Sequence, residues 1–276
     1  MYAQVNGTNL YYETVGEGRP LLLMHGGLGF DHTYFRPSHD RLAEHGFQVV
    51  YYDHRGNGRS ERPADWSGIT HETWAADADA LREYFGWERF TLLGQSYGGV
   101  LAQEYALRYQ DRLESLILAC TLPAMDYPEV IEANARARGT DEEVAEFLGA
   151  LANPSDDDDE VRALFAKYFK WYFHRWDEAA GQAGIAKTHF SGPAFHHSFT
   201  QCMPKFNVVD QLHTIKVPTL VVAGRHDWIT PPEQAERIAA RIAGSEVFIF
   251  ENSGHMPHDE EPELYLQVIG GWLDRH

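Results

Sequence analysis

The chain has 276 residues, and its 41 acidic against 23 basic side chains give a formal charge of −18 with histidine neutral. This acidic balance disfavours nucleic acid as a partner, because phosphate neutralisation requires a surplus of Lys and Arg. It disfavours an anionic membrane surface for the same reason. The content of 43% hydrophobic and 13% aromatic residues excludes a disordered chain, and the length suffices for a sizeable core.

Two cysteines, Cys120 and Cys202, are too few for a disulfide framework. We interpret both as unpaired thiols, as is typical of a reducing compartment. The N-terminal residues contain no basic region followed by an apolar stretch, and no apolar run reaches the length of a membrane span. We therefore expect no secretory signal, no membrane association and a cytoplasmic location.

The N-terminal segment is predicted to form a β-hairpin. Tyr2–Val5 and Leu10–Val15 flank Asn6-Gly7, a pair that suits a tight turn needing positive φ. Short continuous apolar runs then recur, which is typical of strands buried on both faces of a parallel sheet. These runs are Leu21–Met24, Phe47–Tyr52, Phe90–Leu93, Leu116–Cys120, Thr219–Ala223 and Glu246–Phe250.

Helical patterns alternate with these apolar runs. Val100–Tyr109 has helical periodicity. Pro231–Ala243 follows Thr230 and contains Glu233, and this arrangement is typical of a capping box. The alternation of strands and helices predicts an α/β fold with a parallel sheet.

The stretch Pro123–Thr214 interrupts the alternation, because it contains helical patterns and no convincing strand. We interpret it as a helical insertion, residues 123–214, that packs over one edge of a core domain made of residues 1–122 and 215–276. Within it, the acidic run Asp156–Asp159 precedes the helical pattern Val161–Trp176. We interpret the run as a solvated helix N-terminus, where negative charge suits the helix dipole, rather than as a calcium site.

The strongest signal for chemistry is the stretch Gly94-Gln-Ser96-Tyr-Gly98. It matches G-x-S-x-G between an apolar run and a helical pattern, which is the context of a nucleophile elbow. In such a turn the glycines relieve crowding, and the serine hydroxyl is lifted clear of the sheet. We predict Ser96 as a nucleophile, and the alternative is a glycine-rich turn with an incidental serine.

A serine nucleophile needs a base. Among the 15 histidines, His255 follows the last apolar run, and Gly254 leaves the backbone free to turn it inward. A loop at that point reaches the carboxyl edge of the sheet, where Ser96 is expected. We predict His255 as the base, with His258 as the competing candidate; a surface loop histidine is the alternative for both.

The base in turn needs an orienting carboxylate. Asp227 follows the run Thr219–Ala223 at the carboxyl end of a predicted strand, and it stands between Ser96 and His255 in chain order. The run Leu116–Cys120 also precedes a loop at the carboxyl edge, but no acid occurs there before Asp126. We therefore predict Asp227.

The glycine-rich stretch after Leu21–Met24 is a candidate for binding an oxyanion. His25-Gly-Gly27-Leu-Gly29 allows backbone N–H groups to face a developing negative charge. We assign the N–H groups of Gly27 and Tyr97 as the two donors. One such donor is worth about 3 kcal/mol in the transition state.

Together, the glycine-rich stretch, the elbow around Ser96, Asp227 and His255 resemble the corresponding parts of the α/β-hydrolase family. The resemblance covers nearly the whole chain. It implies a mostly parallel eight-stranded sheet flanked by helices, with the insertion as a helical cap. Three stretches are similar to those of proline iminopeptidases: His25-Gly-Gly, Gly94-Gln-Ser-Tyr-Gly-Gly and Ala106-Leu-Arg-Tyr-Gln-Asp.

The chain departs from the proline iminopeptidase pattern at three positions, which we expect to contact the substrate. Leu28 stands where that family usually has proline. Trp228 replaces a glutamate after the triad aspartate, and Phe195 replaces the glutamate of a Gly-Pro-x-Glu stretch. The two acids would bind a free α-amino group, so their replacement removes the charge partner that a desolvated ammonium needs. Another cap acid such as Glu178 could substitute for them.

The sequence therefore predicts a serine hydrolase that cleaves a small, largely apolar ester, lactone or amide. Proline iminopeptidase-like release of an N-terminal residue is the first alternative, and a non-catalytic hydrolase-fold binding protein is the second. His196-His197 lacks the further ligands of a metal set. We expect no metal, no cofactor and only a small-molecule partner, and the pattern leaves the oligomeric state open.

Overall fold

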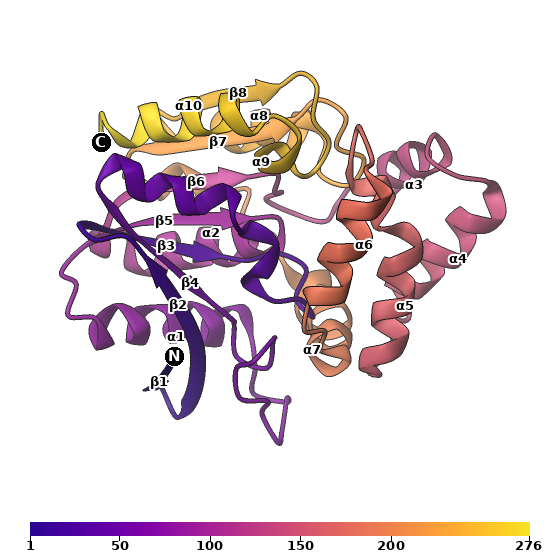
Figure 1. Ribbon diagram of the computed structural model, residues 1–276, viewed down its shortest axis with the longest axis horizontal. Helices are drawn as coiled ribbons and strands as arrows, with labels where there is room; N and C mark the ends of the chain where they lie inside the picture. The colour runs from indigo at the N-terminus through magenta and orange to yellow at the C-terminus, as the bar shows by residue number, and fades with distance from the viewer.

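The computed structural model describes all residues, 1–276, and contains one eight-stranded sheet in the order β1-β2-β4-β3-β5-β6-β7-β8 (Figure 1). β1 is antiparallel to β2 and β2 to β4, whereas the remaining neighbours are parallel. The predicted mostly parallel eight-stranded sheet is confirmed. The strands are β1 Tyr2–Val5, β2 Thr8–Val15, β3 Arg19–Met24, β4 Phe47–Tyr52, β5 Phe90–Gln95, β6 Leu113–Ala119, β7 Thr219–Gly224 and β8 Glu246–Phe250.

The strands form where the sequence combines apolar runs with suitable turns. β5 and β7 are buried along their whole length, as expected of central strands covered on both faces. In the hairpin turn between β1 and β2, Asn6 and Gly7 both have positive φ, 46° and 72°. Two positive φ values match the twist of a tight antiparallel turn, so this pair sets the pairing of Val5 with Thr8.

Helices cover both faces of the sheet. The buried side chains of α1, α2 and α8 pack on one face, and those of α10 and the 3-10 helix Ser38–His45 pack on the other. α2 begins directly after Ser96, three residues before the predicted start. The helices outside the segment between β6 and β7 are α1 His71–Tyr84, α2 Tyr97–Tyr109, α8 Pro232–Ala239, the short α9 Pro257–Glu260 and α10 Pro262–Leu273.

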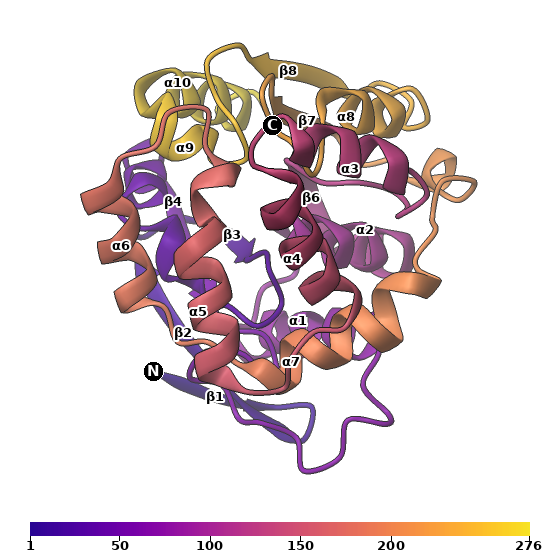
Figure 2. The ribbon, with the colours of Figure 1, turned by 90° about the vertical axis from the view of Figure 1, so that its right-hand side faces the viewer.

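The segment between β6 and β7 is helical and lies beyond the carboxyl ends of the parallel strands (Figure 1). Figure 2 looks onto this side, with α4, α5, α6 and α7 in front of the sheet. We call this helical segment the cap. Its helices are α3 Pro128–Arg136, α4 Asp141–Ala152, α5 Asp158–Tyr168, α6 Glu178–Lys187 and α7 Gly192–His197.

Two helix starts were assigned from the sequence, with different outcomes. The acidic run does begin α5, since Asp157 accepts hydrogen bonds from the N–H groups of Asp159 and Glu160. The capping box at Thr230 is wrong: α8 starts with Pro231 at its N-cap, and no side chain caps it. The Thr230 hydroxyl instead donates to Asp227, a contact between loop residues that the capping pattern does not reveal.

None of the helices combines the length and the apolar character that a membrane crossing requires.

Candidate active site

Ser96 occupies a strained turn between β5 and α2. Its φ of 57° and ψ of −123° are rarely adopted by a residue with a side chain. The turn is held by two hydrogen bonds, from the Ser96 N–H to the Ala119 carbonyl at 2.9 Å and from the Thr121 hydroxyl to the Ser96 carbonyl at 2.7 Å. This geometry is that of a nucleophile elbow, with the hydroxyl projecting at the start of a helix.

Glycines flank the elbow because neighbouring backbone leaves no room for a Cβ. A Cβ at Gly94 would overlap the Gly98 carbonyl, and a Cβ at Gly98 would overlap the Met24 carbonyl at the end of β3. Gly26 is also close to the elbow, since a Cβ there would sit 2.7 Å from the Ser96 Cβ. The elbow and the turn after β3 therefore pack backbone against backbone.

Replacing Gly98 with alanine is expected to lower the free energy of unfolding by about 3 kcal/mol, because the methyl group must push the Met24 carbonyl away. Urea denaturation measures the change. Gly149→Ala is the matched control: it lies within α4, where a Cβ meets nothing within 4 Å. That variant should gain about 0.8 kcal/mol from the higher helix propensity of alanine. Equal stability of Gly98→Ala and wild type would contradict the described packing.

A buried histidine–aspartate pair lies beside the elbow. The His255 Nδ1 donates to Asp227 Oδ2 at 2.6 Å, and both residues are almost fully buried. Asp227 Oδ1 accepts from the N–H groups of Ile229 and Thr230, both at 3.0 Å. The Thr230 hydroxyl completes the set, donating to Oδ2 at 2.6 Å. The carboxylate is thus fixed, and with Nδ1 protonated the His255 Nε2 is left free as an acceptor.

The competing histidine lies elsewhere. The His258 ring packs in a buried cluster with the rings of His39 and Tyr265, with centroids 4.9 and 5.8 Å away. Burial lowers the pKa of His258, and its ring does not line the cavity beside Ser96. The structure therefore brings His255, and not His258, together with Asp227.

Backbone N–H groups converge next to Ser96. Gly27 has a φ of 85°, which glycine adopts readily. Neither the Gly27 N–H nor the Tyr97 N–H at the first position of α2 donates to another group of the chain. Gly27, Tyr97, Ser96 and His255 all line one cavity. Two unused donors beside a serine suit the binding of an oxyanion.

A hydrogen-bonded link that the sequence analysis missed joins these parts. The Tyr34 hydroxyl accepts from the Gly26 N–H at 2.7 Å and donates to the Gln95 side chain. Gln95 Nε2 donates to the carbonyl of His255 at 2.9 Å. Tyr34 and Gln95 therefore connect the glycine turn, the elbow and the histidine loop. The bonded partners Gln95 and His255 are 160 positions apart, so no local pattern signals the link.

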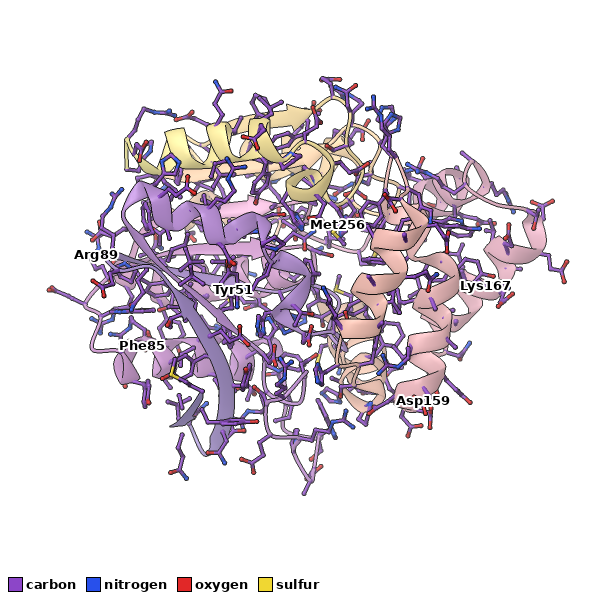
Figure 3. All side chains as sticks on the ribbon, viewed as in Figure 1. Tyr51, Phe85, Arg89, Asp159, Lys167 and Met256 are labelled. Atoms are coloured by element: carbon purple, nitrogen blue, oxygen red, sulfur yellow. The ribbon has the colours of Figure 1, made fainter.

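The cavity beside Ser96 lies between the core and the cap, and its wall is apolar. Met256, labelled in Figure 3 at this boundary, lines it together with Met125 and Met203. The cavity is narrow, with a volume of about 80 Å³, and no Asp, Glu, Lys or Arg lines it. The remaining apolar residues of the wall are Phe30, Tyr34, Tyr97, Val100, Leu122, Leu151, Phe165, Phe169, Tyr172, Phe199 and Ile229.

The sequence profile of the alpha/beta hydrolase fold matches residues 19–262. This chain belongs to the α/β-hydrolase family. It is 34% identical to a proline iminopeptidase from Saccharolobus solfataricus, over 99% of this chain and 92% of the relative. It is 31% identical to a proline iminopeptidase from Lactobacillus crispatus, over 98% and 96%. Among solved structures, a thermophilic esterase from Thermogutta terrifontis matches with a TM-score of 0.78 and 27% identity, over 100% of this chain and 98% of that one.

In this α/β-hydrolase, the three residues that depart from the proline iminopeptidase pattern do not line the cavity. Leu28, Trp228 and Phe195 are each at most 2% exposed, and none is among the lining residues. The Trp228 ring packs on Tyr172, and the Phe195 ring packs on Phe165 and Phe199. Large aromatic side chains fill space against their neighbours, so Trp228 and Phe195 pack against residues of the wall.

One group of potential metal ligands occurs in this α/β-hydrolase. Side-chain atoms of Cys120, Asp227 and His255 lie within 4.8 Å of one another, all buried. The Asp227 carboxylate and the His255 Nδ1 are already hydrogen-bonded to each other. Burial, with the nearby Asp227 charge, raises the pKa of the Cys120 thiol, which disfavours the thiolate that a metal would need. The chemistry of these donors therefore fits a hydrogen-bonded pair better than a metal site.

Proposed function

We propose that this α/β-hydrolase is a serine hydrolase that cleaves a carboxylic ester, lactone or amide whose acyl group is small, neutral and apolar. The observation that carries the proposal is the cavity beside Ser96, whose wall is apolar and contains no charged side chain. Such a wall favours apolar groups by removing their surface from water. An ammonium buried there would lose its hydration without gaining a carboxylate partner.

Each step of the proposed reaction uses groups described above. Ser96 Oγ attacks the carbonyl carbon while His255 Nε2 accepts the hydroxyl proton. The tetrahedral oxyanion is bound by the Gly27 and Tyr97 N–H groups. As the intermediate collapses, His255 donates the proton to the leaving alcohol or amine. Water then attacks the acyl-enzyme with His255 again as the base, which releases the acid and restores Ser96.

Asp227 has two functions in this proposal. Its bond to Nδ1 at 2.6 Å keeps the His255 proton on that nitrogen, so that Nε2 is free to accept the proton of the serine. Its negative charge stabilises the imidazolium that forms in each step. The bonds from Thr230 and Ile229 hold the carboxylate in place.

Proline iminopeptidase activity is the second candidate, and the similarity to curated relatives favours it over the first. Two relatives of that description are 34% and 31% identical over nearly the full chain. Against it stand Trp228 and Phe195 at the positions of the two expected glutamates, and the uncharged cavity wall. Glu178, a cap acid considered as a substitute, lies on the exposed side of α6 and accepts from Trp176 and Gln182.

A panel of three substrates separates the two candidates. We expect purified protein to hydrolyse a short-chain p-nitrophenyl ester with a higher kcat/KM than proline p-nitroanilide. We also expect N-acetylproline p-nitroanilide to be cleaved no more slowly than the free amine, because the cavity offers no partner for an ammonium. A strong requirement for the free amine would support the iminopeptidase and overturn our proposal. Failure of a fluorophosphonate to label Ser96 would instead favour a binding protein without turnover.

A further inference from the structure

A short stretch of the cap contacts both loops of the candidate triad. We call this stretch, Tyr172–Arg175, the clasp segment. The N–H of His255 donates to the Tyr172 carbonyl at 2.6 Å. A Cβ at Gly254 would lie 2.6 Å from the same oxygen and 2.9 Å from the His174 nitrogen. The backbone of the histidine loop therefore packs directly against the backbone of the cap.

Glu260 joins the same two backbones through its carboxylate. One oxygen accepts from the N–H groups of His174 and Arg175 at 2.7 and 2.8 Å, and the other accepts from the Gly254 N–H at 2.7 Å. Burial raises the pKa of Glu260, and the three donors oppose that rise. An ionised carboxylate has two strong acceptor oxygens and no proton, so it can accept on both sides at once.

Arg138, which follows α3 in the cap, makes the corresponding contact on the aspartate side. Its guanidinium donates to the Phe173 carbonyl at 2.7 Å and to the His226 carbonyl. No carboxylate lies within salt-bridge distance of it, although the charges of Asp227 and Glu260 counter the lowering of its pKa by burial. The His174 and His226 rings stack at 3.6 Å, which adds a second contact between the clasp segment and this loop.

We propose that the clasp segment positions the two catalytic loops, and that Arg138 and Glu260 are the positioning residues that bind it to them. The inference rests on the proposed function. His226 directly precedes Asp227, and Gly254 directly precedes His255, so each bond restrains the residue next to a triad member. Neither Arg138 nor Glu260 lines the cavity beside Ser96. Their effect on the reaction therefore passes through the backbone.

The clasp segment also connects this restraint to substrate binding. Tyr172 lines the cavity, its ring packs on that of His255 at 5.3 Å, and its carbonyl accepts from the His255 N–H. A substrate that fills the cavity would therefore contact Tyr172, the residue whose carbonyl binds the His255 N–H. We therefore expect the alignment of His255 for reaction to depend on the contact between the cap and the core.

Glu260→Gln and Arg138→Met test the inference in the full-length protein. An amide has only one acceptor oxygen, so Glu260→Gln leaves either the Gly254 N–H or the clasp-segment N–H groups unpaired. Arg138→Met removes both donors at nearly constant volume. We expect each variant to lower kcat for the preferred ester by about 10- to 100-fold with little change in KM, because misplacement of about 1 Å costs that much.

The pH dependence of kcat gives a second readout. Burial raises the pKa of Glu260, and the groups that face its carboxylate are the N–H groups of His174, Arg175 and Gly254 and the Arg138 guanidinium. In the wild type, protonation of Glu260 at low pH should weaken its bonds to the clasp segment and lower kcat. Glu260→Gln gains no proton at this position, so its kcat should lack this step, whereas Arg138→Met should retain it. A general loss of structure would not remove one ionisation from one variant.

Chemical rescue gives a further readout. A solvent-exposed hollow is lined by Arg138, His226 and Asp227, so a small cation can reach the vacated position. Millimolar guanidinium should raise kcat of Arg138→Ala, whereas the same concentration of urea should not. Arg136→Met and Glu263→Gln are the matched controls, since both side chains are largely exposed and pair away from the loops.

The outcomes are distinguishable from a failure of the proposed function. If wild type is not labelled at Ser96 by a fluorophosphonate and hydrolyses no ester or arylamide, the proposed function is wrong. If wild type is active, and both folded variants match it in kcat and in pH profile, only the positioning inference is overturned. Circular dichroism and urea midpoints establish that the variants are folded.

Discussion

Replacing Ser96 with alanine is expected to lower kcat by about a millionfold, because the serine and its base act as a unit and losing either costs nearly the whole effect. The remaining rate would come from substrate binding and the proposed oxyanion donors, the Gly27 and Tyr97 N–H groups. The fold should be retained, since the Ser96 side chain makes no hydrogen bond within the protein and the elbow is held by main-chain contacts. Initial rates with the preferred substrate of the panel, together with fluorophosphonate labelling, measure the change.

The matched control for this variant is Ser245→Ala. Ser245 lies before β8 at the amino edge of the sheet, opposite the cavity, and its hydroxyl donates to the Ala239 carbonyl. Its loss should leave both turnover and labelling unchanged. Turnover by Ser96→Ala at the wild-type rate would show that another group carries the reaction, and the assignment of the elbow would be abandoned.

Asp227→Asn is expected to lower kcat by about 10⁴-fold at neutral pH. The asparagine carbonyl can still accept from the Ile229 and Thr230 N–H groups, and this orients its NH2 toward His255. An NH2 group can only donate, so the imidazole must present an unprotonated Nδ1 to it. The proton then sits on Nε2, which can no longer accept one from Ser96. Stopped-flow or steady-state assays of the preferred ester give the magnitude.

Asp126→Asn provides the control for the aspartate, because Asp126 is the first acid after β6, the other strand considered for this residue. The structure places its carboxylate in an exposed pair with Arg237, at 2.6 Å. We expect that variant to retain wild-type kcat. Loss of activity in Asp126→Asn with activity retained in Asp227→Asn would reverse the assignment.

Local patterns in the sequence determined the strands and the elbow. Continuous apolar runs form the central strands, because burial on both faces demands apolar side chains at successive positions. Asn6-Gly7 determined its turn through the positive φ that both residues adopt. The G-x-S-x-G stretch determined the elbow, since Gly94 and Gly98 sit where any Cβ would overlap backbone. These features depend on residues that are close together in the sequence, so the sequence alone predicts them.

The tertiary structure alone decided which side chains meet. The choice between His255 and His258 rests on the bond to Asp227, 28 residues away. The local sequence predicts Thr230 as a helix cap, but its hydroxyl donates a hydrogen bond to the Asp227 carboxylate. Trp228 and Phe195 resemble substrate contacts by position, but they do not line the cavity. Hydrogen bonds and packing between distant segments depend on how the strands and the cap are placed in space. Local sequence patterns do not predict that placement.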